Sequence, residues 1–141
     1  KRRTDQENHK GQYLMAALHP RTQTLLFALR GCNFNITTDN ILVKQFDCTT
    51  FDVQLIKVCN ASISLTTAAG GIYTAASKGG IAVVAAAQTY SALTGATLGM
   101  GLTIAPAGMD ELSAALLYLN LTTAQGAAAT ADVFVYGCPL T

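Results

Sequence analysis

Apolar and polar residues alternate along much of the chain, which is the pattern of β-strands rather than of helices. The longest alternating run covers residues 51–65, where seven of the eight odd-numbered positions are apolar. A period of two places successive side chains on opposite faces of a strand. Ile56 and Val58 interrupt the polar side of this run. We therefore expect the strand to be covered on both faces at that point, or to bend and change sheet.

Shorter segments predict further strands, and glycine-containing turns separate them. Alternation is clear at residues 98–104, 115–121 and 133–136, and residues 25–29 and 41–46 are additional candidates. Glycine supplies the positive φ angles that tight turns require. Helix is expected in at most one short segment, with residues 81–93 and 109–119 as the two candidates, because alanine and an acidic first turn favour it there.

A short motif occurs twice, 56 residues apart, as SLTTAAGG from residue 64 and as NLTTAQGA from residue 120. Each copy follows an alternating segment and contains a small-residue turn, so both copies are expected to be matching exits from a strand into a turn. Two such exits suit a sandwich of two related halves, as in a jelly roll, and chance recurrence is the alternative. We predict an all-β fold, a jelly-roll-like antiparallel β-sandwich over residues 21–141, preceded by an extended N-terminal arm at residues 1–20.

Charge is scarce and unevenly distributed. Nine Lys and Arg residues against eight Asp and Glu residues leave a net charge of +1, and six of these charged residues lie in the first ten positions. A balance this close to neutral does not favour general binding to nucleic acid or to an anionic membrane. No apolar run reaches the 18 or more residues of a membrane-spanning helix. We expect neither sequence-specific nucleic acid nor a membrane as a partner.

Small residues make up a quarter of the chain, with 23 Ala and 12 Gly among 141 residues. Since each alanine buries only one methyl group, the core is expected to be thin for its length. Exposed strand edges also need charged residues or another device to prevent uncontrolled pairing, and the body of the chain has few charges. We therefore expect part of its surface to be buried in a homo-dimer or homo-trimer.

Residues with catalytic or metal-binding chemistry do not form a recognisable motif. The four cysteines, Cys32, Cys48, Cys59 and Cys138, lack the C-x-x-C spacing of a zinc site, and we expect them to be reduced and structural, with two disulfides as the alternative. The two histidines, His9 and His19, lie near the N-terminus. Asp47 and Asp52 could approach each other as paired acids, but loop-capping roles are commoner. We predict no enzymatic activity, no metal and no cofactor.

Three glycosylation sequons keep a second class of function open. They begin at Asn35, Asn60 and Asn120. A secreted or cell-surface adhesion or binding module would account for them. Against this alternative, Asn60 and Asn120 fall within predicted strands rather than in exposed loops.

Two segments resemble a known class of viral protein. They are VCNASISLTTAAGGIYTAASKGG at residues 58–80 and LLYLNLTTAQGAAATADV at residues 116–133. Over about residues 50–137 the chain resembles small structural proteins encoded among the head genes of tailed bacteriophages. The resemblance implies a capsid decoration or cement protein, often a jelly-roll sandwich, which oligomerises on the capsid exterior and clamps neighbouring subunits of the major capsid protein. A tail, neck or fibre component of the phage particle is an alternative.

The resemblance and the residue pattern together indicate contact residues instead of a catalytic site. We expect Lys1, Arg2, Arg3 and Lys10 in the arm to meet acidic patches on the shell, and Tyr73 and Lys78 to lie in loops at a junction between subunits. The expected partners are the major capsid protein and further copies of the chain, and the expected location is the exterior of the virion capsid.

Overall fold

The structure is a computed structural model and describes residues 23–141. The predicted arm at residues 1–20 lies outside the described residues. Eight strands and one short 3-10 helix follow one another along the described part of the chain: β1 (Thr24–Asn33), β2 (Asp39–Lys44), β3 (Phe51–Cys59), β4 (Ala69–Ala75), β5 (Gly79–Val84), β6 (Gly99–Gly101), η1 (Pro106–Met109), β7 (Leu116–Thr123) and β8 (Thr130–Pro139). The predicted all-β class is confirmed.

The order of the strands is that of a jelly roll. They follow the sequence β5-β4-β7-β2-β1-β8-β3-β6, and every neighbouring pair is antiparallel. The first strand pairs with the last, the second with the seventh, the third with the sixth and the fourth with the fifth. A long two-stranded ribbon that is rolled up on itself produces this pairing. The prediction of a jelly-roll-like sandwich is therefore confirmed.

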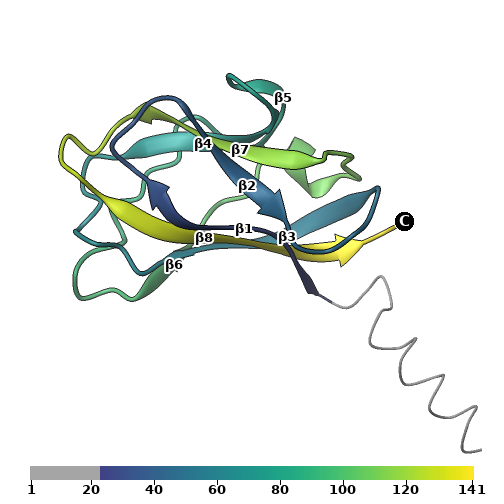
Figure 1. Ribbon diagram of the computed structural model, residues 1–141, viewed down its shortest axis with the longest axis horizontal. Helices are drawn as coiled ribbons and strands as arrows, with labels where there is room; N and C mark the ends of the chain where they lie inside the picture. Colours follow the sequence, from purple (N-terminus) through teal and green to yellow (C-terminus); the bar gives the residue numbers. More distant parts are fainter. Residues whose placement is uncertain (1–22) are drawn as a thin grey trace, which may run out of the picture.

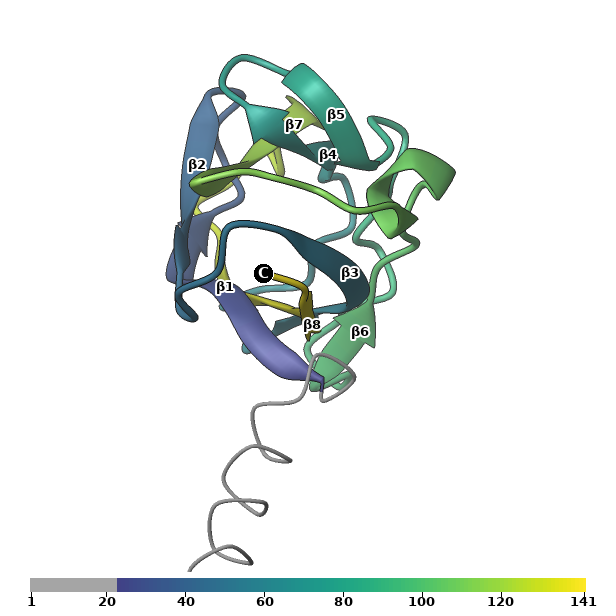
Figure 2. The ribbon, with the colours of Figure 1, turned by 90° about the vertical axis from the view of Figure 1, so that its right-hand side faces the viewer.

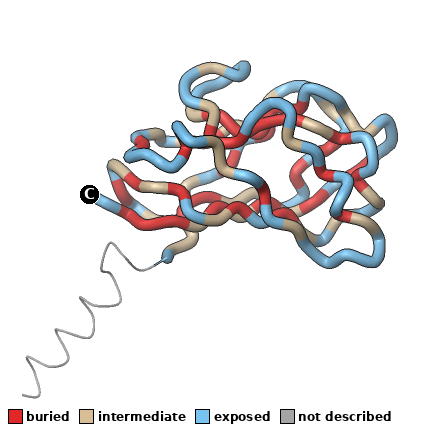
Figure 3. The backbone as a smooth tube through the Cα atoms, turned by 180° about the vertical axis from the view of Figure 1, so that it is seen from behind, coloured by how far each residue is buried: buried red, intermediate tan, exposed pale blue. Residues whose placement is uncertain are grey.

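The rolled ribbon forms two layers that face each other. One layer contains β1, β8, β3 and β6, and the other contains β5, β4, β7 and β2 (Figure 1). The two layers join along one side, where β1 pairs with β2 through Phe27 with Lys44 and Ala28 with Val43. Seen from the end, β5 and β6 lie on the opposite side from this junction, with η1 beside β5 (Figure 2). Buried residues line the space between the layers and exposed residues follow the outside (Figure 3).

The side chain of Asn40 extends the junction beyond the two main-chain pairs. Its Nδ2 donates a hydrogen bond to the carbonyl oxygen of Asn33 at 2.9 Å, and its Oδ1 accepts one from the Asn33 N–H at 3.1 Å. Asn40 is only 8% exposed, so these bonds satisfy polar groups that have little access to water. The amide thus replaces a pair of sheet hydrogen bonds where the strands diverge.

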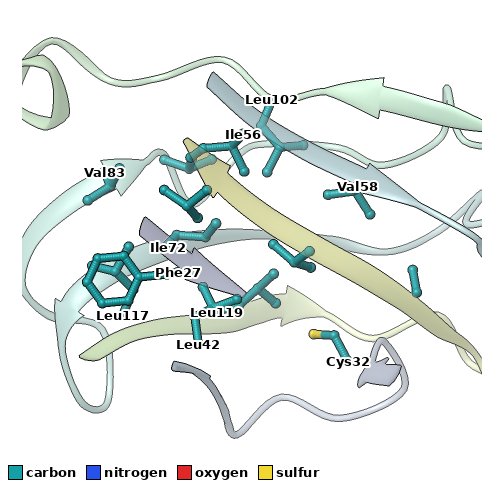
Figure 4. Packing of buried hydrophobic residues seen from close by; sticks show 14 of the residues in the cluster. Phe27, Cys32, Leu42, Ile56, Val58, Ile72, Val83, Leu102, Leu117 and Leu119 are labelled. Carbon is teal, nitrogen blue, oxygen red and sulfur yellow. The ribbon is translucent and has the colours of Figure 1, made fainter. Parts of the chain in front are cut away.

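Large aliphatic and aromatic residues fill the core. Leucine, isoleucine, valine and phenylalanine side chains from both layers meet between them (Figure 4), and only three alanines, Ala68, Ala129 and Ala131, belong to the buried set. Most other alanines in the described residues are exposed or only partly buried and many lie in turns. The assumption behind the prediction of a thin core, that the alanines fill it, is therefore wrong, because the small residues are used mainly in connections.

A β-bulge in β3 explains the two apolar residues that interrupted the longest alternating run. The register of β3 against β8 shifts between Val53 and Leu55, so the inward face changes from odd to even positions. Val53 is buried before the shift, and Ile56 and Val58 are buried after it. The strand also ends at Cys59, not at residue 65. The predicted strand over residues 51–65 is thus too long, and Ile56 and Val58 are explained by a change of facing within β3, not by cover on both faces or a change of sheet.

The other predicted strand and helix segments agree with the structure near β7 and β8 and agree only in part elsewhere. Of the predicted run 115–121, residues 116–121 fall in β7, and residues 133–136 fall in β8, with alternate residues buried as expected; Ala115 precedes β7 and is exposed. Residues 98–104 supply only the short strand β6. The helix candidate at 81–93 begins as β5, and in the described residues helix occurs only at η1. The limit of one short helix therefore agrees with the structure.

The two copies of the repeated motif lie side by side but do not play the same role. The second copy ends β7, whereas the first is a loop that leads into β4. The side-chain oxygen of Gln125, from the second copy, accepts hydrogen bonds from the N–H groups of Thr67 and Ala68 at 3.0 and 3.1 Å. The prediction of matching strand exits is wrong for the first copy, which the second copy instead holds in place.

The edge strands are protected without charged residues. β6 has only three residues, which leaves a very short free edge. Along β5, the N–H of Ala105 donates a hydrogen bond to the Val83 carbonyl oxygen at 2.8 Å. Gly108 of η1 lies so near Val83 that an added Cβ would be 2.8 Å from the Val83 Cα. Association through strand edges is therefore less favoured than association through a sheet face.

Candidate functional site

An apolar area covers the outer face of the layer that contains β2, β7 and β4. We call it the outer apolar patch, and it consists of the exposed Ile41 and Val43 and the half-buried Leu116 and Tyr118, with the nearly buried Tyr73 beside Tyr118. Register pairs Ile41 with Tyr118, Val43 with Leu116 and Tyr73 with Tyr118, so these side chains share one face. Ile41 is 45% exposed and Val43 is 50% exposed. The solvent-facing side of a sandwich usually carries polar residues, so this patch is unusual.

The outer face of the other layer is different in charge. Lys57 pairs with Phe134, and Cys59 pairs with Asp132, so a lysine and an aspartate lie on that face. The guanidinium carbon of Arg30 lies 5.9 Å from the centre of the Phe134 ring. A hydrogen bond from the Asn60 side chain, helped by the Gly31 N–H and nearby Arg30, holds the pKa of Asp132 below its ordinary value. Among the described residues, the β2–β7–β4 side therefore has an uncharged apolar centre, with Asp39 at one end of it.

A polar cleft of about 290 Å³ adjoins the outer apolar patch at one end. Its lining residues come from the β1–β2 turn, the start of β2, the β4–β5 turn and β7: Thr37, Thr38, Asp39, Ser77, Lys78 and Asn120. Asp39 is opposite Asn120 in the sheet, two residues from the Ile41–Tyr118 pair. The cleft therefore continues the same outer face beyond its apolar part.

Asp39 organises this cleft. Its Oδ1 accepts a hydrogen bond from Asn120 Nδ2 at 2.8 Å, and its two carboxylate oxygens accept from the Ser77 N–H at 3.2 and 2.9 Å. Asn120 is 5% exposed, and its Oδ1 is buried without a hydrogen-bond partner among the described residues. The carboxylate thereby ties the β4–β5 turn to β2 and β7.

The β4–β5 turn has a backbone conformation that its residues do not favour. The Gly79 N–H donates to the Ala76 carbonyl oxygen at 3.1 Å, and the two central residues, Ser77 and Lys78, have φ angles of 56° and 63°. These are the features of a type I′ turn, which prefers Asn-Gly. A left-handed conformation costs roughly 1–2 kcal/mol for a residue with a side chain. The bonds from Asp39 help to hold this strained turn at the cleft.

The predicted contact residues fall in different places. Lys1, Arg2, Arg3 and Lys10 lie outside the described residues, as do His9 and His19. Lys78 is exposed in the β4–β5 turn and lines the cleft. Tyr73 was expected in a loop, but it lies within β4 and is only 6% exposed. Its loop assignment is wrong because the Gly70-Gly71 pair is inside the strand and does not end it.

The cysteines and acidic residues do not gather into a reactive centre in the described part of the chain. All four cysteines are free, and burial raises the pKa of the Cys32 thiol to about 12. Asp52 accepts a hydrogen bond from the Cys138 N–H at 2.8 Å, a structural role. Among residues 23–141 no three His, Cys, Asp or Glu side chains are placed to hold a metal ion. Within the same range, no helix has the length and apolar character needed to span a bilayer.

The three sequons are not equivalent once the chain is folded. Asn35 is exposed in the turn after β1, where its Oδ1 accepts a hydrogen bond from the Gly126 N–H at 2.9 Å. Asn60 is exposed just after β3, with its Nδ2 bonded to Asp132 Oδ2 at 2.9 Å. Asn120 is buried and its Nδ2 is engaged by Asp39. Only Asn35 and Asn60 therefore remain open to modification in the folded protein.

Sequence reasoning did not identify the outer apolar patch. Ile41-Leu42-Val43 is a run of three apolar residues, which hides the fact that only Leu42 faces the core. The signal that could have revealed the patch is that a strand with apolar residues on both faces needs a partner on each. Comparison of the chain with protein-family models, with curated proteins and with solved structures identified no match.

Proposed function

We propose that this chain is a non-enzymatic structural protein of a tailed-phage virion, which decorates the capsid exterior and cements neighbouring major capsid protein subunits. The observation that carries the proposal is the outer apolar patch, an uncharged face on a rigid jelly-roll sandwich. Exposed apolar faces of this kind mark surfaces that are buried in assemblies. The resemblance of residues 58–80 and 116–133 to phage head proteins supports the same reading.

The mechanism requires buried surface instead of turnover. A stable contact buries about 800 Å² per partner, and repetition over a shell multiplies the effect of each contact. In this proposal the sandwich provides the rigid body, a sheet face associates with a neighbour, and the basic residues at the N-terminus meet acidic patches on the shell. Lys78, exposed beside the cleft, is a further candidate for a polar contact at the junction.

The direct test is to mix the purified chain with undecorated capsids of a tailed phage that encodes it. Cosedimentation with the capsids, and an increase in their resistance to heat, are the expected results. A variant in which Lys1, Arg2, Arg3 and Lys10 are replaced by alanine should bind more weakly, especially at low salt. The matched control is Lys57→Ala, which removes a lysine from the body. Failure of the wild-type chain to cosediment would contradict the proposal and favour a tail, neck or fibre position.

The exposed sequon at Asn35 favours one second candidate, a secreted or cell-surface binding module. A turn residue with an accessible amide is the usual setting of N-linked glycan. Secretion from a eukaryotic host, followed by intact-mass measurement of wild type and Asn35→Gln, tests this alternative. Glycan on the protein from its natural source would support it over the virion proposal.

A further inference from the structure

We propose that the polar cleft beside the outer apolar patch is a binding site for a neutral sugar of about the size of one pyranose ring. The inference goes beyond the proposed function and does not depend on it, because a cement protein needs no small ligand. The cleft measures about 290 Å³, close to the lower end of the roughly 300–1,000 Å³ that small-molecule sites occupy. It therefore suits a single ring and not a longer chain of sugars.

An acceptor without a donor is the first observation. Asn120 lines the cleft and is 5% exposed, and its Oδ1 is buried without a hydrogen-bond partner among the described residues. The orientation of this amide is fixed, because its Nδ2 donates to Asp39 Oδ1 at 2.8 Å and a turned amide would place two acceptors against each other. Buried polar groups are nearly always paired, so a donor is expected at this atom when the site is occupied.

Asp39 offers a second acceptor. A carboxylate has about four positions at which it can accept a hydrogen bond. Oδ1 accepts from Asn120 Nδ2 and from the Ser77 N–H, whereas Oδ2 accepts only from the Ser77 N–H. One position on Oδ2 is therefore free. Asp39 and Asn120 are paired in the sheet, so the two acceptors lie close together.

The rim of the cleft supplies donors. The hydroxyl groups of Thr37, Thr38 and Ser77 and the ammonium group of Lys78 are exposed, and no hydrogen bond or ion pair engages these groups within residues 23–141. A hydroxyl group both donates and accepts, and an ammonium group only donates. The cleft thus combines free acceptors at its base with free donors at its rim.

This combination selects the class of ligand. A sugar hydroxyl donates one hydrogen bond and accepts others, so a ring with several hydroxyls matches both the acceptors and the donors. A metal ion fits less well, because the cleft has a single carboxylate, Asp39, and a lysine, Lys78, at its rim. A phosphate or carboxylate ligand would meet the negative charge of Asp39. The opposite charges of Asp39 and Lys78 leave the cleft neutral overall, which favours a neutral ligand.

The adjoining apolar residues fit the rest of a sugar ring. Ile41 and Tyr118 lie on the same face, two residues from Asp39 and Asn120, or about 7 Å along the strands. Ile41 is exposed and Tyr118 is half-buried. A pyranose has C–H groups on its faces and hydroxyls around its edge, and aromatic and aliphatic side chains pack against such C–H groups. The chain therefore presents a polar and an apolar surface side by side, as a sugar requires.

The test is a nuclear magnetic resonance titration of the full, ¹⁵N-labelled chain. The probes are the methyl glycosides of glucose, galactose, mannose and N-acetylglucosamine, with glycine and calcium chloride as the alternative ligands. At least one sugar should cause saturable shifts of the Asn120 side-chain amide and of the Ser77 and Lys78 backbone amides. The expected dissociation constant is about 1–10 mM, which is usual for a ligand with so few atoms.

Two pairs of variants compare the cleft with other surfaces. Thr38→Val removes a hydroxyl from the cleft, and Thr103→Val removes one from an exposed threonine outside it. Lys78→Gln removes the ammonium group at the rim, and Lys57→Gln removes one from the other outer face. The two cleft variants should raise the dissociation constant about threefold to tenfold, and the two controls should leave it nearly unchanged. The amide spectrum of each variant shows whether it is folded.

Four results would overturn the sugar site. These are no saturable shift with any of the four sugars, shifts confined to residues outside the cleft, equal weakening by cleft and control variants, or saturation by glycine or calcium chloride in place of a sugar. Capsid cosedimentation is a separate measurement, so either outcome of the titration leaves the test of the cement function unchanged.

Discussion

Replacement of Asn40 by aspartate tests how the two layers of the sandwich are joined. The Asn40 amide donates to the carbonyl oxygen of Asn33 at 2.9 Å and accepts from the Asn33 N–H at 3.1 Å. Asn40→Asp keeps the shape and the acceptor, but it replaces the donor by a second carboxylate oxygen. That oxygen then faces the Asn33 carbonyl oxygen, so an attraction becomes a repulsion at the junction.

The expected loss can be worked from this geometry. A net hydrogen bond contributes about 0.5–1.5 kcal/mol, and an acceptor left without a donor in a partly buried place costs about 1–3 kcal/mol. Asn33 itself is exposed, so water relieves part of that cost. We expect Asn40→Asp to lower the free energy of unfolding by about 2–3 kcal/mol at pH 7. For a domain of this size, that corresponds to a fall of roughly 8–12 °C in melting temperature.

The pH dependence of this loss gives a sharper result than its size. A protonated carboxyl at position 40 can donate to the Asn33 carbonyl oxygen, so its pKa in the folded variant is raised above the unfolded value of about 3.9. The penalty of the charged form is complete above the folded pKa. It decreases as the pH falls through that value, and it disappears below the unfolded pKa. The difference between wild type and variant should therefore shrink between neutral pH and about pH 4.

Thermal and urea unfolding followed by circular dichroism measure both quantities. Asn35→Asp is the matched control, because Asn35 is exposed and its side chain is an acceptor for the Gly126 N–H, a role that a carboxylate keeps. This control should change the free energy of unfolding by less than about 0.5 kcal/mol. If Asn40→Asp were as stable as wild type at pH 7, or if its deficit were constant down to pH 4, the Asn40 amide would not be holding the layers together.

Three further predictions concern single residues. Lys78→Gly should have a free energy of unfolding about 0.5–1 kcal/mol higher than Lys78→Ala, because glycine adopts the positive φ of this turn without strain. Urea unfolding measures the difference, and equal stability of the two variants would contradict the strain. Gly137→Ala should lower the melting temperature far more than Gly101→Ala, since an added Cβ would overlap the Asp52 carbonyl at position 137 and meets its nearest atom at 3.8 Å at position 101. The pKa of Asp132 is held below 3.8, so its contribution to stability is present above that pH and is lost as the pH falls through the folded value. Acid unfolding of Asp132→Asn should accordingly be less steep than that of wild type, and parallel curves would refute this.

The fold class could be predicted from the sequence because strand periodicity is a local property. The predicted runs at 115–121 and 133–136 are read correctly apart from Ala115, since β7 and β8 have no extra residue within these runs. In β3 the shift between Val53 and Leu55 exchanges the two faces, and no local signal marks where it occurs. The pairing of β1 with β8 depends on contacts between segments that are far apart in the sequence. Periodicity alone carries no information about such partners.

The candidate site was harder to predict than the fold. The outer apolar patch and the cleft both arise from strands that are distant in sequence, such as β2 and β7. Tyr73 follows a Gly-Gly pair that resembles a turn, so its place inside β4 was missed. The contrast between a charged and a neutral outer face exists only after the register of every strand is known. Lys78, in contrast, was placed correctly in a turn because Gly79-Gly80 follows it directly.

The pairing of the first strand with the last has a consequence for how the protein is made. β1 leaves the ribosome long before its neighbour β8, because the two strands are far apart in the sequence. Until then the hydrophobic residues of β1, including Leu26 and Phe27, lack the neighbouring strand that β8 provides. Folds dominated by pairings between distant segments fold slowly, and their folding intermediates expose hydrophobic surface that promotes aggregation. The jelly roll can therefore complete its folding only after β8 has been synthesised. Expression at low temperature, with chaperones that protect the nascent chain, should accordingly give the highest yield of folded protein.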